Sequence, residues 1–406
     1  MSKLTVYINP LDENGAYEGF QEVTKDVDLN AIGKITRKLD NNNYNVGLFS
    51  FSNTSLRLRN DHGFYSEPGQ PRSIFKSKRT DSLVKILWSE GEPAICGSAI
   101  CGISVLGPEL EIYKGFINDD SLSSDIDDQK VKFAVLGMES LFDRVETPFA
   151  ALSSGVAAST TIFNILNVSG ITDLLTVSAL NISLGNDQTT DTIADLENTT
   201  VKEALDILLE ASNAILYIES DVVYIVPRDP TATTPVTFYG QASNIGIENI
   251  VDISKIKSGR AKMFNFWTWS DTTLSSKEAT SITNNGVRKK EVDFTLFTNT
   301  VKRQAILDDL RDEFGPSKRE MDLSVSLTRE ALTPIILDRI NMDYPTIYTA
   351  TDPEIGAPIY GVALYGTAKY PRSQWSLNLT TAENFKIIGI NINIKRETIT
   401  YNLREV

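Results

Sequence analysis

Apolar and polar residues alternate along several short stretches of this chain, which is the pattern of strands that bury one face. The clearest case is residues 388–394, where isoleucine fills every second position. A turn at Arg396 and Glu397 follows, and the alternation resumes over 399–403. Because a two-stranded ribbon is only marginally stable alone, we predict that this pair belongs to a larger sheet.

The first 150 residues carry many further strand patterns, separated by turn residues such as Asn, Asp, Gly and Pro. A short helix over 138–145 is expected after the last of them. Many short strands with turns between them are typical of a barrel or a sandwich. The predicted strands cover residues 4–8, 35–39, 46–49, 55–59, 83–88, 111–117 and 131–136, the last two paired around a polar loop.

Residues 294–343 predict a short strand, one helix and two more strands, the first of them over 323–327. Asn299 and Thr300 are residue types that cap helix N-termini. Gly315 and Pro316 should end the helix, because Gly adopts the left-handed conformation and Pro cannot continue a helix. The expected apolar face comprises Val301, Ala305, Ile306, Leu310 and Phe314, and the polar face Asp308, Asp309, Arg311 and Asp312.

Residues 151–235 predict helices followed by a hairpin. A helix is expected over 161–168 and a polar loop over 185–198. Thr200 and Glu203 have the spacing of a capping box, and apolar residues at helical spacing continue to Leu209. Two apolar strands, 214–218 and 222–226, come next with a turn between them.

These patterns predict an α+β fold that is mainly β. Two tube-like β-barrel or sandwich domains, 1–150 and 236–406, each carry one helix and flank a helix–hairpin domain, 151–235; the helix of the last domain is 300–314. A chain of 406 residues is long enough for two or three domains. Residues 270–285 are polar and predict a mobile loop, and residues 349–383 predict a long excursion.

Composition and charge exclude several classes of function. The hydrophobic content of 41% and charged content of 23% are ordinary for a globular protein. The net charge of −14 argues against a DNA or RNA reader, which needs cations facing phosphates, although DNA could slide past an acidic wall. With no apolar run of about 18–20 residues and no secretory signal, we expect no membrane partner, and N-x-[ST] matches at Asn181, Asn198 and Asn378 are attributed to chance.

The scarcity of histidine and cysteine excludes several kinds of site. A catalytic triad could use only His62, and a zinc site with two or three histidines cannot be built from one chain. His62 follows Asn-Asp and precedes Gly, so we interpret it as a turn residue. Cys96 and Cys101 are spaced for a disulfide, with reduced buried thiols or a metal site shared between symmetry-related chains as alternatives. Gly-rich phosphate loops are absent from the sequence.

Two clusters could still carry chemistry. One is a run of aspartates, which has no glycine for the sharp turn of a calcium loop and no glutamate at the twelfth position. Pairs of carboxylates with the spacing found in glycosidases arise easily by chance among 53 acidic residues. A solvated loop is therefore favoured. Four aromatics are divided between the two faces of a strand, which favours a core and interface role over a sugar platform. We predict no catalytic, cofactor-binding or metal-binding residue and no enzyme. The run is Asp119, Asp120, Asp125, Asp127 and Asp128; the aromatics are Phe264, Phe266, Trp267 and Trp269.

Four stretches carry a family resemblance when they are read in order. They are residues 55–67 with 83–88 and 109–119, then 198–228, then 294–344, and finally 385–406. They resemble, in this order, the first tube-like domain, the helix–hairpin unit, the second tube-like domain and the closing strands of the central hub proteins of bacteriophage tails and contractile injection baseplates. The resemblance touches all three regions and covers under half of the residues.

The resemblance implies a structural protein of the virion tail, assembled in the cytoplasm of the host bacterium. Three chains with two tube domains each would form a pseudo-sixfold ring between the tail tube and the tail tip, with DNA passing through the lumen without specific binding. The implied partners are the tail tube, the distal tail protein and the tip or spike. A closed ring also protects strand edges. The chain departs from some members in lacking a lysozyme or peptidase extension and a four-cysteine iron–sulfur cluster.

Three alternatives stay open. The first is a hexameric distal-tail ring component, which differs from the hub in oligomeric state. The second is a carbohydrate-binding or depolymerising tail protein that uses the acidic residues and aromatics. The third is an unrelated cytosolic β-rich enzyme. Turnover of a cell-wall polysaccharide, lost on changing one carboxylate pair, would establish the second.

Overall fold

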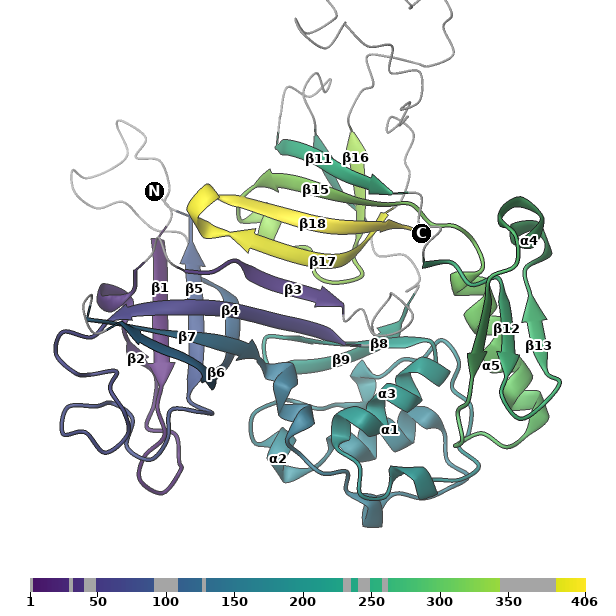
Figure 1. The fold of residues 1–406 in the computed structure, drawn as a ribbon, viewed down its shortest axis with the longest axis horizontal. Helices are drawn as coiled ribbons and strands as arrows, with labels where there is room; N and C mark the ends of the chain where they lie inside the picture. Colours follow the sequence, from purple (N-terminus) through teal and green to yellow (C-terminus); the bar gives the residue numbers. More distant parts are fainter. Residues whose placement is uncertain are drawn as a thin grey trace, which may run out of the picture.

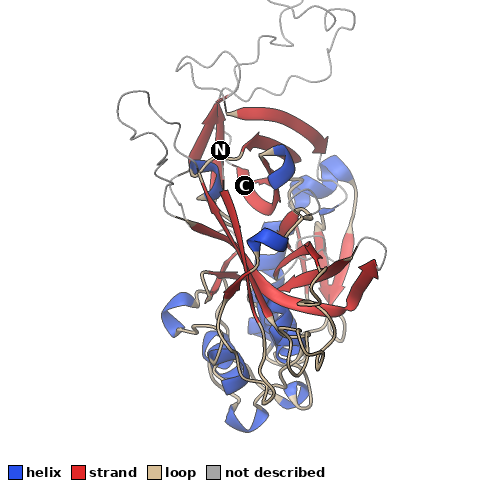
Figure 2. Ribbon diagram, turned by 90° about the vertical axis from the view of Figure 1, so that its left-hand side faces the viewer, coloured by secondary structure: helices blue, strands red, loops and turns tan. Residues whose placement is uncertain are grey.

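The fold is α+β and mainly β, as predicted. In the computed structural model, the residues described are 3–28, 32–39, 49–90, 109–125, 129–228, 235–239, 249–257, 262–343 and 385–406. Strands dominate one half of the molecule, and α1 to α3 gather beneath them (Figure 1). The side view has the same separation, with most helical segments below the strands (Figure 2).

One 13-stranded sheet contains strands from both ends of the chain. Its main path runs β11-β15-β18-β17-β3-β4-β7-β6-β5-β1-β2, and β18, β17, β3, β4 and β7 lie one below the other in Figure 1. The strands are β1 (Lys3–Asn9), β2 (Gln21–Glu22), β3 (Ile35–Leu39), β4 (Ser50–Arg59), β5 (Leu83–Ser89), β6 (Leu110–Asp125), β7 (Lys130–Gly137), β10 (Val236–Tyr239), β11 (Ile250–Lys257), β15 (Glu320–Ser326), β16 (Arg339–Asp343), β17 (Phe385–Asn393) and β18 (Thr398–Glu405).

The seam between the two strand-rich parts is the antiparallel pair β17–β3, where Ile390 lies opposite Arg37. The predicted C-terminal ribbon β17–β18 therefore does join a larger sheet. These 13 strands form one continuous sheet, and this sheet does not close into a barrel. The proposed boundaries of the tube-like domains stay predictions.

Alternation explains why these segments become strands. β4 buries every second residue over its whole length, and β18 buries Ile399, Tyr401 and Leu403 in the same way. Burying one face of each strand removes apolar area from water at roughly 25 cal/mol per Å². The register is fixed because a slip by one residue would turn every apolar side chain toward solvent.

The predicted helix–hairpin region packs beneath this sheet (Figure 1). Thr200 accepts a hydrogen bond from the backbone N–H of Glu203, whose carboxylate accepts in return from the N–H of Thr200, so the capping box is present. The expected helix over 161–168 and the hairpin are also confirmed. The elements are α1 (Ala158–Leu166), α2 (Ser169–Thr172), α3 (Val201–Ala211), β8 (Ala214–Glu219) and β9 (Val222–Pro227).

A small α/β unit lies at one side of the molecule (Figure 1). Its three-stranded sheet has the order β13-β12-β14 and is covered by the longest helix, α5. Two predictions fail in this unit. Residues 270–285, predicted as a mobile loop, include a strand and a helix, because Ser281 is buried and donates to the carbonyl of Gly315 at 2.6 Å. Residues 294–298, where a short strand is predicted, form a turn, and the strand lies before them. The elements are β12 (Phe266–Trp269), β13 (Ser275–Lys277), α4 (Ala279–Asn285), β14 (Lys289–Val292) and α5 (Thr300–Phe314).

Helix α5 has the predicted bounds, but two of its details differ from prediction. Val301 is 77% exposed because it lies in the first turn, off the apolar face, and Leu307 is buried instead. Gly315 is not left-handed, with φ −68°. Glycine is required there by space, since a Cβ would lie 2.5 Å from the carbonyl oxygen of Arg311.

Two smaller predictions for residues 1–150 also differ from the structure. The polar stretch after Ile117 is not a loop at its start, since β6 continues to Asp125 and pairs with β7. In this pairing Asp125 lies opposite Lys130 in the backbone register. The short helix at 138–145 is a 3-10 helix, Met138–Asp143. The excursion predicted for 349–383 lies outside the described residues.

Candidate functional site at the ends of helix α5

Of the residues considered as sites from the sequence, the structure describes His62 and the four aromatics. His62 is an exposed turn residue, as predicted, with its ring 6.1 Å from that of Phe64. Cys96, Cys101 and the side chains of the acidic run, Asp119 to Asp128, lie outside what the structure describes. Among the residues described, no group of three or more His, Cys, Asp and Glu side chains could hold a metal ion. None of the described helices is long and apolar enough to cross a membrane.

The aromatic cluster belongs to the core of the small unit. Trp267 and Trp269 are buried, at 0% and 2% exposure, and their rings lie 5.7 Å from Phe314 and 5.6 Å from Phe294. The core role predicted for them is confirmed. On the opposite face of β12, Phe266 is half-buried under the ammonium group of Lys277, 4.5 Å from the ring centre.

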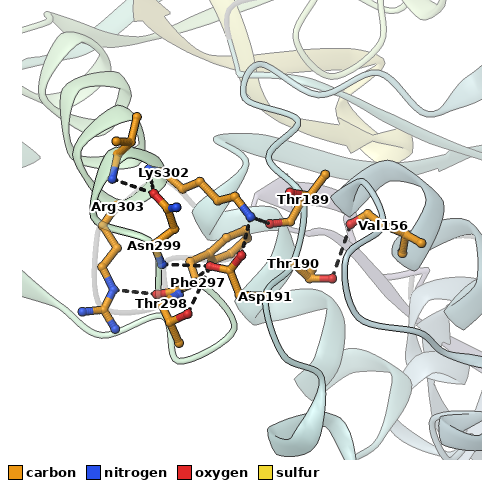
Figure 3. A network of polar contacts seen from close by, with 10 residues as sticks. Val156, Thr189, Thr190, Asp191, Phe297, Thr298, Asn299, Lys302 and Arg303 are labelled. Atoms are coloured by element: carbon orange, nitrogen blue, oxygen red, sulfur yellow. Dashed lines mark hydrogen bonds and ion pairs between the residues drawn. The ribbon is translucent and has the colours of Figure 1, made fainter.

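Polar side chains from several elements meet at each end of α5. At the N-terminal end, the carboxylate of Asp191 accepts the backbone N–H groups of Thr298 and Asn299 at 2.8 and 2.9 Å (Figure 3). Lys302 forms an ion pair with the same carboxylate and donates to the carbonyl of Thr189 at 2.8 Å. Asp191 comes from the loop before α3, so this contact fastens the helix–hairpin region to the small unit.

The position of Asp191 suits a carboxylate. The N-terminus of a helix presents unpaired N–H groups and partial positive charge, and Asn299 already caps the N–H groups of Val301 and Lys302. Burial alone would raise the pKa of Asp191, but the hydrogen bonds from Lys302, Asn299 and Thr298 outweigh it and lower that pKa to about 2. We call Asp191, Thr298, Asn299 and Lys302 the N-terminal clasp.

At the C-terminal end of α5, Glu313 is 6% exposed and lies between two lysines. Its carboxylate is 2.9 Å from the Nζ of Lys318 and 3.3 Å from the Nζ of Lys386, which is in β17. Lys386 also donates to the carbonyl of Arg228 at 2.8 Å, directly after β9. This contact joins the helix, the large sheet and the hairpin.

Two arginines complete this group. The guanidinium carbons of Arg228 and Arg404 lie 5.3 and 5.7 Å from the ring centre of Phe314, and each arginine is 2% exposed. Cations over an aromatic face are attracted by its negative charge. Burial lowers the pKa of Arg228 to about 10, although Glu313 acts in the opposite direction. We call Glu313, Lys318, Lys386, Arg228 and Arg404 the C-terminal cluster.

The electrostatics of Glu313 depend on its neighbours. Burial would raise its pKa, but Lys386, Lys318 and Arg404 outweigh this and hold the pKa at about 2. A carboxylate at the C-terminal end of a helix also faces the unfavourable end of the helix dipole. Glu313 is therefore stable as an anion only while its cations remain in place.

Sequence reasoning missed both ends. A signal existed for the C-terminal cluster, because Glu313 falls three residues after Leu310 on the apolar side of the helix, and Lys386 lies in an apolar strand. No local signal existed for Asp191, which lies in a polar loop that no periodic pattern places near α5.

The contacts at both ends of α5 hold regions of the chain together, and the fold around them is shared with known proteins. Comparisons with protein-family models and with curated protein sequences gave no match. Among solved structures, the whole chain has the fold of phage and prophage tail proteins.

Three of these structures cover nearly all of both chains. The 43 kDa tail protein of prophage MuSo2 from Shewanella oneidensis is 11% identical, covering 100% of this chain and 98% of its own, with a TM-score of 0.52. A tail protein from Neisseria meningitidis MC58 is 11% identical over 100% and 96%, with a TM-score of 0.53. Prophage tail protein gp18 from Listeria monocytogenes EGD-e is 10% identical over 98% and 94%, with a TM-score of 0.50.

Proposed function

We propose that this protein is a structural component of a phage tail, and specifically a hub that forms a trimeric ring between the tail tube and the tail tip. The observation that carries the proposal is the fold, which matches tail proteins over the full length of the chain. The contacts at both ends of α5 fit a static role, because they join regions of the chain instead of leaving polar groups available for a substrate.

The large sheet supports the ring. The N-terminal and C-terminal strand-rich parts share one sheet through β17 and β3, as two tube-like halves of one protomer would. The ends of the main strand path are β2 and β11, and each has an exposed apolar residue: Phe20, directly before β2, is 40% exposed, and Val251 in β11 is 58% exposed. In a cyclic trimer, one end of the sheet would contact the other end in the next protomer.

The proposed hub has no catalysis of its own. DNA would pass through the lumen without specific contacts, and the neighbours would be the tail tube, the distal tail protein and the tip or spike. The protein would assemble in the host cytoplasm and remain in the virion tail.

Light scattering on the purified protein tests the ring. Three chains of 44.9 kDa give an expected mass of about 135 kDa. Val251→Asp should lower the trimer fraction, because it places a charge in the proposed contact, whereas Val287→Asp, at a residue 62% exposed on the small unit, should leave it unchanged. A hexamer would favour the distal-tail ring component. A monomer at every concentration would contradict the ring.

A further inference from the structure

A carboxyl group is buried where the first strands meet the helix–hairpin region. Glu139 is 4% exposed and belongs to the 3-10 helix Met138–Asp143. The side chain that hydrogen-bonds to it is Ser52 of β4, whose hydroxyl lies 3.1 and 3.4 Å from the two carboxyl oxygens. A Cβ at Gly137 would lie 2.0 Å from Oε2 of Glu139 and 1.9 Å from the Ser52 hydroxyl oxygen. Small residues at 52 and 137 therefore make room for this carboxyl group.

Arg37, whose charge acts on Glu139, is already engaged with other partners. Arg37 of β3 forms an ion pair with Glu219 of β8 at 2.7 Å and donates to the carbonyl of Ile112 at 3.2 Å. Arg37 therefore fastens the hairpin to the sheet. Arg37 attracts the Glu139 carboxylate, but among the contacts described it makes no direct hydrogen bond to that carboxylate.

The other titratable groups around Glu139 leave its charge largely uncompensated. From β6, the hydroxyl of Tyr113 donates to the carbonyl of Val135 at 2.7 Å and is turned to the backbone. From α3, Lys202 pairs with Asp143 at 3.2 Å, at the far end of the 3-10 helix. Burial raises the pKa of Glu139 to about 7, against the opposing effects of its own N–H, Arg37 and Ser52.

We propose that the protonation state of Glu139 controls how firmly the hairpin β8–β9 is held to the large sheet. When Glu139 is neutral, Glu219 alone balances the charge of Arg37. When its proton leaves to solvent, the buried carboxylate attracts Arg37 and competes with Glu219. Of the two ion pairs described between sheet and hairpin, that of Arg37 with Glu219 therefore weakens, while Lys114 of β6 keeps its ion pair with Asp221. This inference rests on the geometry of the joint and does not depend on the proposed tail function.

Hydrogen exchange measured by mass spectrometry tests the proposal on the full chain. After correction for the intrinsic pH dependence of exchange, amides of residues 214–227 should exchange several-fold faster at pH 8 than at pH 6 in the wild type. Glu139→Gln should keep these amides protected at both pH values. Glu146→Gln, which changes an exposed glutamate in the same region, should behave like the wild type.

Two further variants keep the test decisive if Glu139→Gln does not fold. Glu219→Gln removes the partner of Arg37, so exchange of the hairpin should be fast at both pH values. Ser52→Ala removes a hydrogen-bond donor to the carboxylate, so the pH midpoint of the change should move upward. A wild-type hairpin with equal protection at both pH values, a pH response that persists in Glu139→Gln, or an unmoved midpoint in Ser52→Ala would overturn the proposal.

Discussion

The two ends of helix α5 hold carboxylates in opposite ways. Asp191 is on another element, retains 21% side-chain exposure and meets the helix where its backbone N–H groups are unpaired. Glu313 is part of the helix itself, is almost fully buried and meets the unfavourable end of the helix dipole. The helix dipole thus supports the first carboxylate, whereas the second depends entirely on side chains from other elements.

This difference predicts unequal consequences when each end is broken. The N-terminal clasp can exchange its bonds for water, because it is partly exposed. The C-terminal cluster has no such replacement, since removing its one carboxylate leaves several cations buried without their partner.

The largest loss of stability is expected from a substitution on the helix between its two ends. Leu310→Asp places a charge on the buried face of α5, where Leu310 is 1% exposed, and should prevent folding or assembly. Soluble yield and the circular dichroism spectrum measure the outcome. Val301→Asp on the same helix is the control and should fold normally, because Val301 is 77% exposed. Normal assembly of Leu310→Asp would contradict the packing of this helix.

Breaking the C-terminal cluster should lower the free energy of unfolding by less than Leu310→Asp does, but still by several kcal/mol. Glu313→Gln keeps the shape of the side chain and removes the charge, so Lys318 and Lys386 lose their buried partner. We expect a loss of about 3–5 kcal/mol of unfolding free energy, measured by urea denaturation. Asp312→Asn is the control. The side chain of Asp312, which pairs with Arg311, is 65% exposed, so losing this ion pair should change the stability little. Equal stability of the two variants would show that the cluster does not support the fold.

Acid should weaken both ends in the same pH window. The folded pKa values of Asp191 and Glu313, both about 2, lie below the ordinary values of 3.8 and 4.5. A lowered carboxyl pKa contributes stability that is complete above the ordinary value and is lost as pH falls through the folded value. Urea unfolding should therefore show stability falling between about pH 5 and pH 2. Glu313→Gln should flatten this fall, and a variant with the wild-type slope would assign the acid sensitivity to other groups.

The smallest effect is expected at the N-terminal clasp. Asp191→Asn removes the ion pair with Lys302 and weakens the bonds from Thr298 and Asn299, at an expected cost of about 1–2 kcal/mol. Hydrogen exchange should speed up in the first turn of α5 only. Asp187→Asn is the matched control in the same loop, because Asp187 bonds Ser159 at the start of α1 instead. Faster exchange throughout α5 in Asp191→Asn would mean that this clasp holds more than the helix terminus.

Local patterns predicted the elements of this fold well, and long-range contacts much less. The bounds of α5, the capping box of α3 and the ribbon β17–β18 depend on residues close in sequence, so periodicity and capping residues were sufficient. The seam between β17 and β3 joins strands far apart in the chain, and no local pattern contains such a pairing. Polar segments misled the prediction for 270–285, because Ser281 is buried through hydrogen bonds and not through apolar contact.

The contacts at the ends of α5 were harder to predict than the helix itself. Charged residues such as Lys386 are normally solvated, and here Lys386 is buried because Glu313 and the carbonyl of Arg228 supply partners from other elements. Asp191 is an ordinary loop residue until the tertiary fold brings the start of α5 to it. The position of Glu313 three residues after Leu310, and that of Lys386 in an apolar strand, are the two sequence signals that charges face the core.

The seam between β3 and β17 also constrains the order in which the chain can fold. A ribosome synthesises β3 long before β17, so β3 remains without its second partner until the roughly 350 residues between them have emerged. Pairing between such distant strands closes a long loop and slows folding. Until it forms, an apolar strand edge is exposed to other chains. The same seam means that a chain cut short before β17 cannot complete the sheet, so only copies that contain β17 would offer a finished surface for assembly.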